Sequence, residues 1–275
     1  GVYMGNGTFN MTGGAIQSCS ATDGGGVYVD GGTFEMTDGT ISACNATNAG
    51  GGVYVSSGTF EMSGGSIENC TAHEGAGVKV LVSSGKASFS MSGGTIEDNS
   101  GFGVWVDNGS AVMSGGSVKG SERYDIYIGS RAALTVKNTQ VGGTVLNLGK
   151  ITGQGSAEFT GTVENSGSAA AGITGCKIHR IEHRSPHKGT IENSTWDEYV
   201  YLLGHSWPTA KIPSEAGESI TLKVSSYLPP VMENSLTIPE GVTVTVDLAG
   251  KTLSAEEESD FKIINHGSLT LIDSS

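Results

Sequence analysis

The sequence has no long hydrophobic run and comparatively few basic residues. No apolar stretch approaches the roughly 20 residues that a bilayer-spanning helix needs, so we expect no membrane insertion. Lys and Arg together number 15 against 28 Asp and Glu, which gives a net charge of −13. Because a surface this acidic repels phosphate backbones, we also expect no nucleic-acid partner.

The familiar catalytic and metal-binding motifs are missing as well. The chain contains no GxSxG nucleophile turn, no HExxH zinc motif, no phosphate-binding glycine loop and no calcium-binding nonapeptide. We therefore expect no cofactor and no metal. These absences leave open whether the chain is an enzyme.

One short segment does carry residue types that ligate zinc, namely Cys176, His179, His183 and His187. Pro186 would interrupt a helix that placed the three histidines on one face, and the neighbouring basic side chains would repel a dication. We interpret the segment as a solvated, locally basic loop. Zinc binding and attraction of an acidic glycan remain as alternatives.

Proline is also scarce, with 6 residues, whereas glycine is abundant, with 44. No Gly-X-Y triplet persists, which excludes collagen. Val, Ile, Phe and Met recur at regular intervals between the glycines, which argues against disorder. The glycines therefore mark turns.

A unit of about 25 residues repeats through the first 120 residues. Gly24–Ala49 reads GGGVYVDGGTFEMTDGTISACNATNA, and Gly50–Gly75 reads GGGVYVSSGTFEMSGGSIENCTAHEG. The chain opens in the middle of a unit, so we expect it to be part of a longer, multidomain protein. The equivalent methionines are Met11, Met36, Met62, Met91 and Met113, at spacings of 25, 26, 29 and 22 residues.

Each unit contains three short segments, of the types VYV, TFEM and SI or TI. The first two alternate between apolar and polar residues, which is the pattern of a β-strand. Strands this short need neighbours, and stacking identical turns about 4.8 Å apart supplies them. The pattern predicts an all-β parallel β-helix with three strands per turn. Its inward side chains would be Val27, Val29, Phe34, Met36 and Ile41 with their equivalents.

The repeat resembles two groups of known proteins. It is similar to the pectin-lyase-like right-handed β-helix superfamily, and more closely to the GGxYVxxGxFxMSGGxIxxN repeats of secreted bacterial surface proteins. The resemblance implies an extracellular or cell-surface location. It specifies the fold better than the function, since the superfamily includes lyases, hydrolases, adhesins and stalks.

We expect the β-helix to cover residues 1–203, with regular turns over 1–120 and irregular turns over 121–203. Residues 189–194 resemble the third segment of the unit. From residue 204 to 275 we expect a less regular β-rich module that resembles the start or the cap of a further β-helix.

In a stacked solenoid each repeat position becomes a row along the axis. The central position of the first strand gives Tyr3, Tyr28, Tyr54, Lys79, Trp105 and Tyr127. Its neighbours point inward, so we expect this row to point outward, where a line of aromatic rings suits stacking on sugar rings. The alternative is that the row only stabilises the sheet, by roughly 0.2–1 kcal/mol per pair.

Carboxylates near this row are candidates for a catalytic acid and base. Asp98 and Asp107 flank Trp105 in sequence, and Glu35 and Glu61 share the outward position of the second strand. Stacked carboxyls lie about 5 Å apart, which is compatible with a retaining glycosidase. Any outward Glu pair in an acidic solenoid has the same spacing, so a solvated pair is the alternative.

Cysteines occupy one repeat position in three successive turns, at Cys19, Cys44 and Cys70, and Asn99 follows in the next turn. Parallel side chains point the same way, which makes a disulfide torsion hard to reach. We expect buried free thiols.

These observations leave three functions open. The first is a rigid, adhesin-like surface scaffold that binds glycans through Tyr28, Tyr54, Lys79, Trp105 and Tyr127. The second is a β-helical glycoside hydrolase or polysaccharide lyase, for which Asp98, Asp107, Glu35 and Glu61 would supply the acid and base. The third is a stalk that binds nothing.

Overall fold

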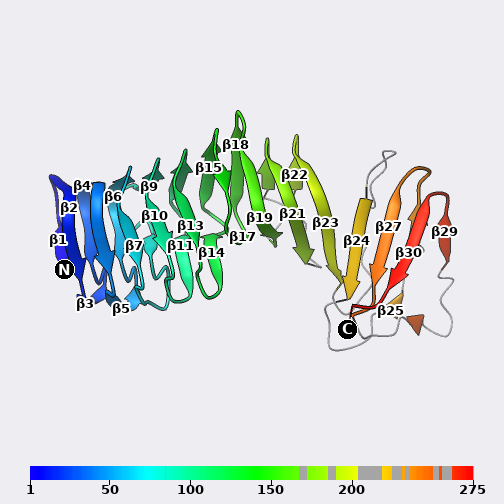
Figure 1. Cartoon of the computed structure of the whole chain (residues 1–275), viewed down its shortest axis with the longest axis horizontal. Helices are drawn as coiled ribbons and strands as arrows, with labels where there is room; N and C mark the ends of the chain where they lie inside the picture. Colours follow the sequence, from blue (N-terminus) through cyan, green and yellow to red (C-terminus); the bar gives the residue numbers. More distant parts are fainter. Residues whose placement is uncertain are drawn as a thin grey trace.

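The computed structural model describes residues 1–83, 85–166, 172–184, 190–203, 219–224, 231–232, 236–249, 254–255 and 262–274. All regular elements in these ranges are β-strands, and the described residues include no helix that could cross a membrane. The strands stand side by side along the long axis of the molecule (Figure 1). Every strand pairing is parallel, as expected for a β-helix.

The strands of the first segment are β1 (Val2–Met4), the start of β4 (Val27–Ser42), the start of β6 (Val53–Met62), β8 (Val78–Val80), β11 (Phe102–Val106), β14 (Tyr124–Ile128) and β17 (Val145–Asn147).

The second and third segments form their own ladders. The second ladder contains β2 (Thr8–Gln17), the middle of β4, the end of β6, β9 (Ala87–Met91), β12 (Ser110–Met113), β15 (Ala133–Lys137) and β18 (Lys150–Gln154). The third contains the ends of β2 and β4, β7 (Ser66–Glu68), β10 (Thr95–Glu97) and β13 (Ser117–Lys119). The two-residue β16 (Gln140–Val141) pairs with the start of β19 (Glu158–Asn165). The three-strand turn that the repeat predicts is therefore confirmed.

A further short ladder precedes the first segment. It consists of β3 (Ser20–Asp23) and β5 (Asn45–Ala49), and isolated bridges extend it to Thr71, Glu74 and Ser100. The sequence analysis did not predict this ladder. Its importance is that it runs beside the first strands and forms a wall there.

The core consists of the inward rows that the unit predicts. Val27, Val29, Phe34, Met36 and Ile41 are all fully buried. The phenylalanines at the second strand stack along the axis, with ring centroids 5.2, 4.8 and 5.1 Å apart from Phe9 through to Phe89. Stacked rings at this separation add to the burial of apolar area in every turn.

Glycine at the corner before the third strand is required by this packing. Gly65 has a φ of +80°, and a Cβ there would lie 2.6 Å from the Cε of Met36 in the preceding turn. A side chain would therefore meet both backbone strain and the methionine. Gly39, Gly94 and Gly116 repeat the arrangement beside Met11, Met62 and Met91.

The next corner carries the cysteine row. Cys44 and Cys70 are buried, Cys19 is half-buried and all are free thiols, which confirms the expectation. Asn99 continues the row: its Oδ1 accepts a hydrogen bond from the amide of Cys70 at 2.9 Å, and its Nδ2 donates to the carbonyls of Ile67 and Glu97. One buried amide therefore joins two turns.

After β16 the turns become shorter. The third and first segments merge into single strands, and the first-strand register runs from Val145 to Val163 to Ile181, a spacing of 18 residues. Residues 190–192 pair with β20 in the second ladder, so the expectation that they form a third segment is wrong. The strands of this region are β19 (Glu158–Asn165), β20 (Gly172–Thr174), β21 (Lys177–Arg184), β22 (Thr190–Glu192) and β23 (Thr195–Leu203).

The described C-terminal strands continue the parallel pairing. β24 (Ser219–Val224) pairs with β23 on one side and with β27 (Thr243–Asp247) on the other, and β27 pairs with β30 (Ser268–Ile272). A boundary at residue 203 stays a prediction. The remaining short strands form two pairs, β25 (Val231–Met232) with β28 (Ser254–Ala255) and β26 (Leu236–Ile238) with β29 (Ile263–Asn265).

Asn99→Ala should lower the free energy of unfolding by about 1–3 kcal/mol, because it leaves the buried Cys70 amide without its hydrogen-bond partner. Cys70→Asn should stay within about 1 kcal/mol of the parent, since the same corner accepts an asparagine one turn later. Urea unfolding followed by circular dichroism measures both. Equal losses in the two variants would contradict the role assigned to Asn99.

Alkaline pH should destabilise the solenoid through its buried thiols. Burial raises the pKa of Cys70 from its ordinary value of 9.0 to about 12, so the folded chain holds this proton where the unfolded chain releases it. The thiol's contribution is complete below pH 9 and is lost as the pH rises towards 12, by about 1 kcal/mol per pH unit. Urea unfolding at pH 8 and pH 11 should show a smaller decline in Cys70→Val, and an identical decline would contradict this.

Candidate functional site

The outward row of the first strands is the candidate site. The register pairs Tyr3 with Tyr28, Tyr28 with Tyr54, Tyr54 with Lys79, Lys79 with Trp105, and Trp105 with Tyr127. Valines or isoleucines on either side point into the core, which directs the row away from it. The in-register row expected from the repeat is thus present.

The rings of this row pack against one another. Tyr28 and Tyr54 stack with centroids 5.0 Å apart, and Tyr3 meets Tyr28 edge to face at 5.5 Å. Trp105 lies 4.3 Å from the Tyr127 ring, and the Nζ of Lys79 lies 4.2 Å from the Trp105 centroid. Because neighbours in the row occupy the ring faces, the central rings offer edges rather than faces to a ligand.

The side chains of the row are also less exposed to solvent than the alternation of apolar and polar residues predicts. Tyr3 is 65% exposed, but Tyr54 is 6% exposed and Lys79 is fully buried. The expectation of an exposed row is therefore wrong at these two positions. The ladder of β3 and β5 flanks the row on one side. On the other side the lengthened fourth turn brings Ser83 against the Tyr54 hydroxyl.

Lys79 is held by one carboxylate and one aromatic face. Its Nζ lies 2.7 Å from the Oε2 of Glu74, whose side chain is 34% exposed. Burial lowers the pKa of Lys79, while Glu74 and, at longer range, Asp107 act in the opposite direction and favour its charged form. The ammonium thus contacts the Glu74 carboxylate and lies over the Trp105 ring.

The wall beside the row carries its own acidic position. The register of the short ladder pairs Asp23 with Ala49 and Ala49 with Glu74, so Asp23 and Glu74 occupy the same repeat position. Asp23 accepts a hydrogen bond from Asn48 at 2.8 Å. Residue-by-residue analysis of the sequence missed both carboxylates. In the sequence, each carboxylate lies five residues before a position of the row, Asp23 before Tyr28 and Glu74 before Lys79. This constant separation was the signal that could have identified them.

The four candidate catalytic carboxylates lie at three different repeat positions. Glu35 and Glu61 pair directly across neighbouring turns on the second-strand face. Asp98 is an exposed corner residue with a φ of +53°, and its equivalents Ser18, Ala43 and Asn69 share that conformation. Asp107 follows the first strand beside Lys79 and Tyr127. The register therefore brings together only Glu35 and Glu61, and a catalytic role for any of the four stays a prediction.

A comparison with protein families identifies the fold. The family model described as a right-handed β-helix region matches residues 1–141, which is slightly more than half of the chain. The chain belongs to the right-handed β-helix family. Neither the curated proteins nor the solved structures give a match.

In this β-helix the segment that contains Cys176 and the histidines is not a loop. Residues 177–184 form β21, which lies in register between β19 and β23, so the loop interpretation is wrong there. Three of its described side chains have acidic partners: Lys177 pairs with Glu158, the Nδ1 of His179 lies 3.1 Å from Asp197, and Arg180 pairs with Glu182. The side chain of His183 and all of His187 lie outside the described residues. Within the described part of the chain, no group of three or more His, Cys, Asp or Glu could hold a metal.

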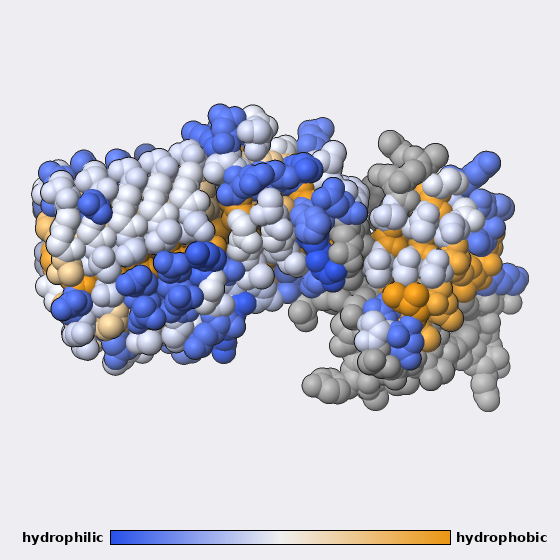
Figure 2. Space-filling model, in the orientation of Figure 1, coloured by the Kyte–Doolittle hydropathy of each residue, from blue (hydrophilic) through white to orange (hydrophobic). Residues whose placement is uncertain are grey.

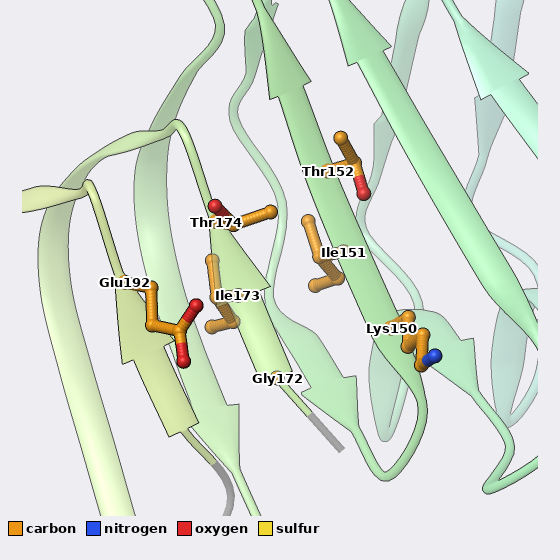
Figure 3. Close-up of a pocket in the computed structure, with 7 residues that line it drawn as sticks. All are labelled: Lys150, Ile151, Thr152, Gly172, Ile173, Thr174 and Glu192. Atoms are coloured by element: carbon orange, nitrogen blue, oxygen red, sulfur yellow. The ribbon is translucent and has the colours of Figure 1, made fainter. Parts of the chain in front are cut away.

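A shallow hollow crosses β18, β20 and β22 on the irregular turns (Figure 3). The hollow lies where Gly172, which has no side chain, pairs with Lys150 on one side and with Thr190 on the other. Its volume of about 160 Å³ is smaller than the roughly 300 Å³ at which small-molecule pockets usually begin. Its floor is formed by Ile151 and Ile173, and its rim by Lys150, Thr152, Thr174 and Glu192.

Trp105→Ala should lower the free energy of unfolding by about 3 kcal/mol, because it removes the packing of Lys79 and Tyr127 on the indole. Tyr3→Ala removes an exposed ring of the same row and should cost less than about 1 kcal/mol. Urea unfolding of the two variants compares them. If Trp105→Ala were as mild as Tyr3→Ala, the indole would not be a structural member of the row.

Proposed function

We propose that this β-helix is a rigid scaffold of a bacterial surface or secreted protein, and that it binds glycans along the outward row of the first strands. The observation that supports the proposal best is the unbroken register of this row from Tyr3 to Tyr127. A row repeated at every turn suits an extended polymer that lies along the axis.

Such a polymer would contact the members of the row that keep part of their ring accessible between neighbouring turns. Tyr28, Trp105 and Tyr127 are each half-buried. Tyr28 and Tyr127 also carry hydroxyl groups. Ring edges and hydroxyls of this kind contact the hydroxyl groups of sugars through hydrogen bonds. Tyr54 and Lys79 then act as the packed part of the row.

The rest of the surface is consistent with a scaffold outside the cell. The N-terminal turns carry pale, weakly polar residues in regular rows above a strongly hydrophilic cluster (Figure 2). Together with the net charge of −13, this favours solubility. The alternative of a glycoside hydrolase or lyase gains no support from the register, which separates Asp98 and Asp107 from the Glu35–Glu61 pair.

A glycan array of neutral and charged oligosaccharides tests the proposal. The parent chain should bind at least one class, and Tyr28→Ala should weaken that binding about tenfold. Leu271→Ala is the matched control, because Leu271 is 62% exposed in β30, far along the chain from the row. If the parent bound no glycan, the stalk function would replace this proposal.

A further inference from the structure

The three free cysteines of the regular turns form a column at the corner after the third strand. Strand pairing on both sides of each cysteine keeps Cys19, Cys44 and Cys70 in register. Neighbouring thiols of this thiol column are therefore about 4.8 Å apart, which is the distance between paired strands. Cys19 is half-buried, whereas Cys44 and Cys70 are buried, so solvent reaches the column at Cys19.

The contacts of the thiols show that all three side chains point the same way. Each Sγ lies beside the carbonyl oxygen two residues earlier in its own turn, at 3.5 Å for Cys19 and 3.4 Å for Cys44 and Cys70. The Sγ atoms of Cys44 and Cys70 also lie 3.6 and 3.9 Å from the carbonyls of Ile16 and Ile41, which hold equivalent places in the preceding turns. The line that joins two neighbouring sulfurs therefore runs along the solenoid axis, across the Cβ–Sγ bonds.

This arrangement is wrong for a disulfide but fits a linear metal bridge. A disulfide needs a Cβ–S–S–Cβ torsion near 90°, whereas parallel side chains give a torsion near zero. A d10 ion binds a thiolate at about 2.3 Å, as zinc does, so two collinear bonds span about 4.6 Å, close to the separation of neighbouring turns. Such an ion lies on the line between two sulfurs, where it replaces the thiol hydrogens and needs no separate cavity.

The column can hold an ion only through two adjacent thiols. The outer thiols of Cys19 and Cys70 are two turns apart, about 9.6 Å, so the three sulfurs cannot converge on one ion. This agrees with the finding that no group of three or more donors in the described residues could hold a metal. Thiolates select soft ions, and two thiolates balance the charge of a divalent ion, which leaves the bridged pair neutral in its buried corner.

We infer that adjacent thiols of the column bind a soft divalent d10 cation, of which Hg(II) is the example, in linear two-coordinate geometry. Two sulfur–metal bonds form, and the two thiol protons leave to solvent. Because the middle thiol of Cys44 belongs to both pairs, the column holds one ion. Zn(II) is rejected, since it requires four ligands. The site is separate from the outward row of the first strands, so it goes beyond the proposed function and does not depend on it.

Native mass spectrometry of the whole chain, loaded with Hg(II) and dialysed against excess 2-mercaptoethanol, tests the site. Cys19→Val and Cys70→Val each leave one adjacent pair and should retain one ion, as the parent does. Cys44→Val leaves two thiols that are two turns apart, so the fraction of chain that holds mercury without bound 2-mercaptoethanol should fall at least tenfold. The matched control is Cys176→Val, which removes a buried free thiol outside the column and should retain the ion.

Three results would overturn the site: equal retention in Cys44→Val and Cys19→Val, equal loss in all three column variants, or loss in Cys176→Val. Retention of Zn(II) as tightly as Hg(II) would overturn the linear geometry. Circular dichroism establishes that each variant is folded. If Cys44→Val does not fold, the double variant Cys19→Val, Cys70→Val takes its place, because it keeps the middle thiol alone and should lose the ion in the same way.

Discussion

The whole structure depends on one constraint, the parallel pairing of each strand with its copy about 4.8 Å away. This spacing falls within the roughly 4.5–7 Å range of centroid separations that offset aromatic pairs prefer, so phenylalanines and tyrosines can stack along the axis. The centroids along the phenylalanine row are 4.8–5.2 Å apart. The same spacing forbids a side chain where a neighbouring turn approaches from above, which explains the glycine at Gly65. The stacking of the aromatic rings and the requirement for glycine at the corners thus both follow from the distance between neighbouring turns.

The same constraint changes the meaning of an outward aromatic residue. In an isolated strand an outward tyrosine would expose both faces of its ring. In register with its copies it covers their faces and is covered in turn, so Tyr54 retains only 6% of its exposure. The row consequently stabilises the sheet at its fully covered members, and only its half-buried members are accessible to a ligand. The structural and the binding interpretation of the row therefore apply to different members of it.

The repeat unit was sufficient to predict the regular turns, because its apolar alternation and its glycines specify both strand direction and turn position. The inward residues, the register and the free cysteines all followed from it. The β3–β5 wall did not, since residues such as Asn45 and Thr47 carry no apolar alternation and pair only because the turns are already stacked. The 18-residue turns were missed for a related reason. Their third and first strands merge with only Gly161 between them in β19 and with no glycine between them in β21, so the sequence marks the change weakly.

The short ladder and the aromatic row end at different points along the chain. In the regular turns a separate wall segment lies between the third and the first strand, and Asp23 and Glu74 are members of it. Its last bridge reaches Ser100, whereas the aromatic row continues through Trp105 to Tyr127. In β19 and β21 the third and first strands run together, and the row continues from Tyr127 to Leu146, Glu164 and Glu182 without aromatic residues. The proposed glycan contacts are therefore confined to the turns up to Tyr127, and the later turns extend the scaffold beyond them.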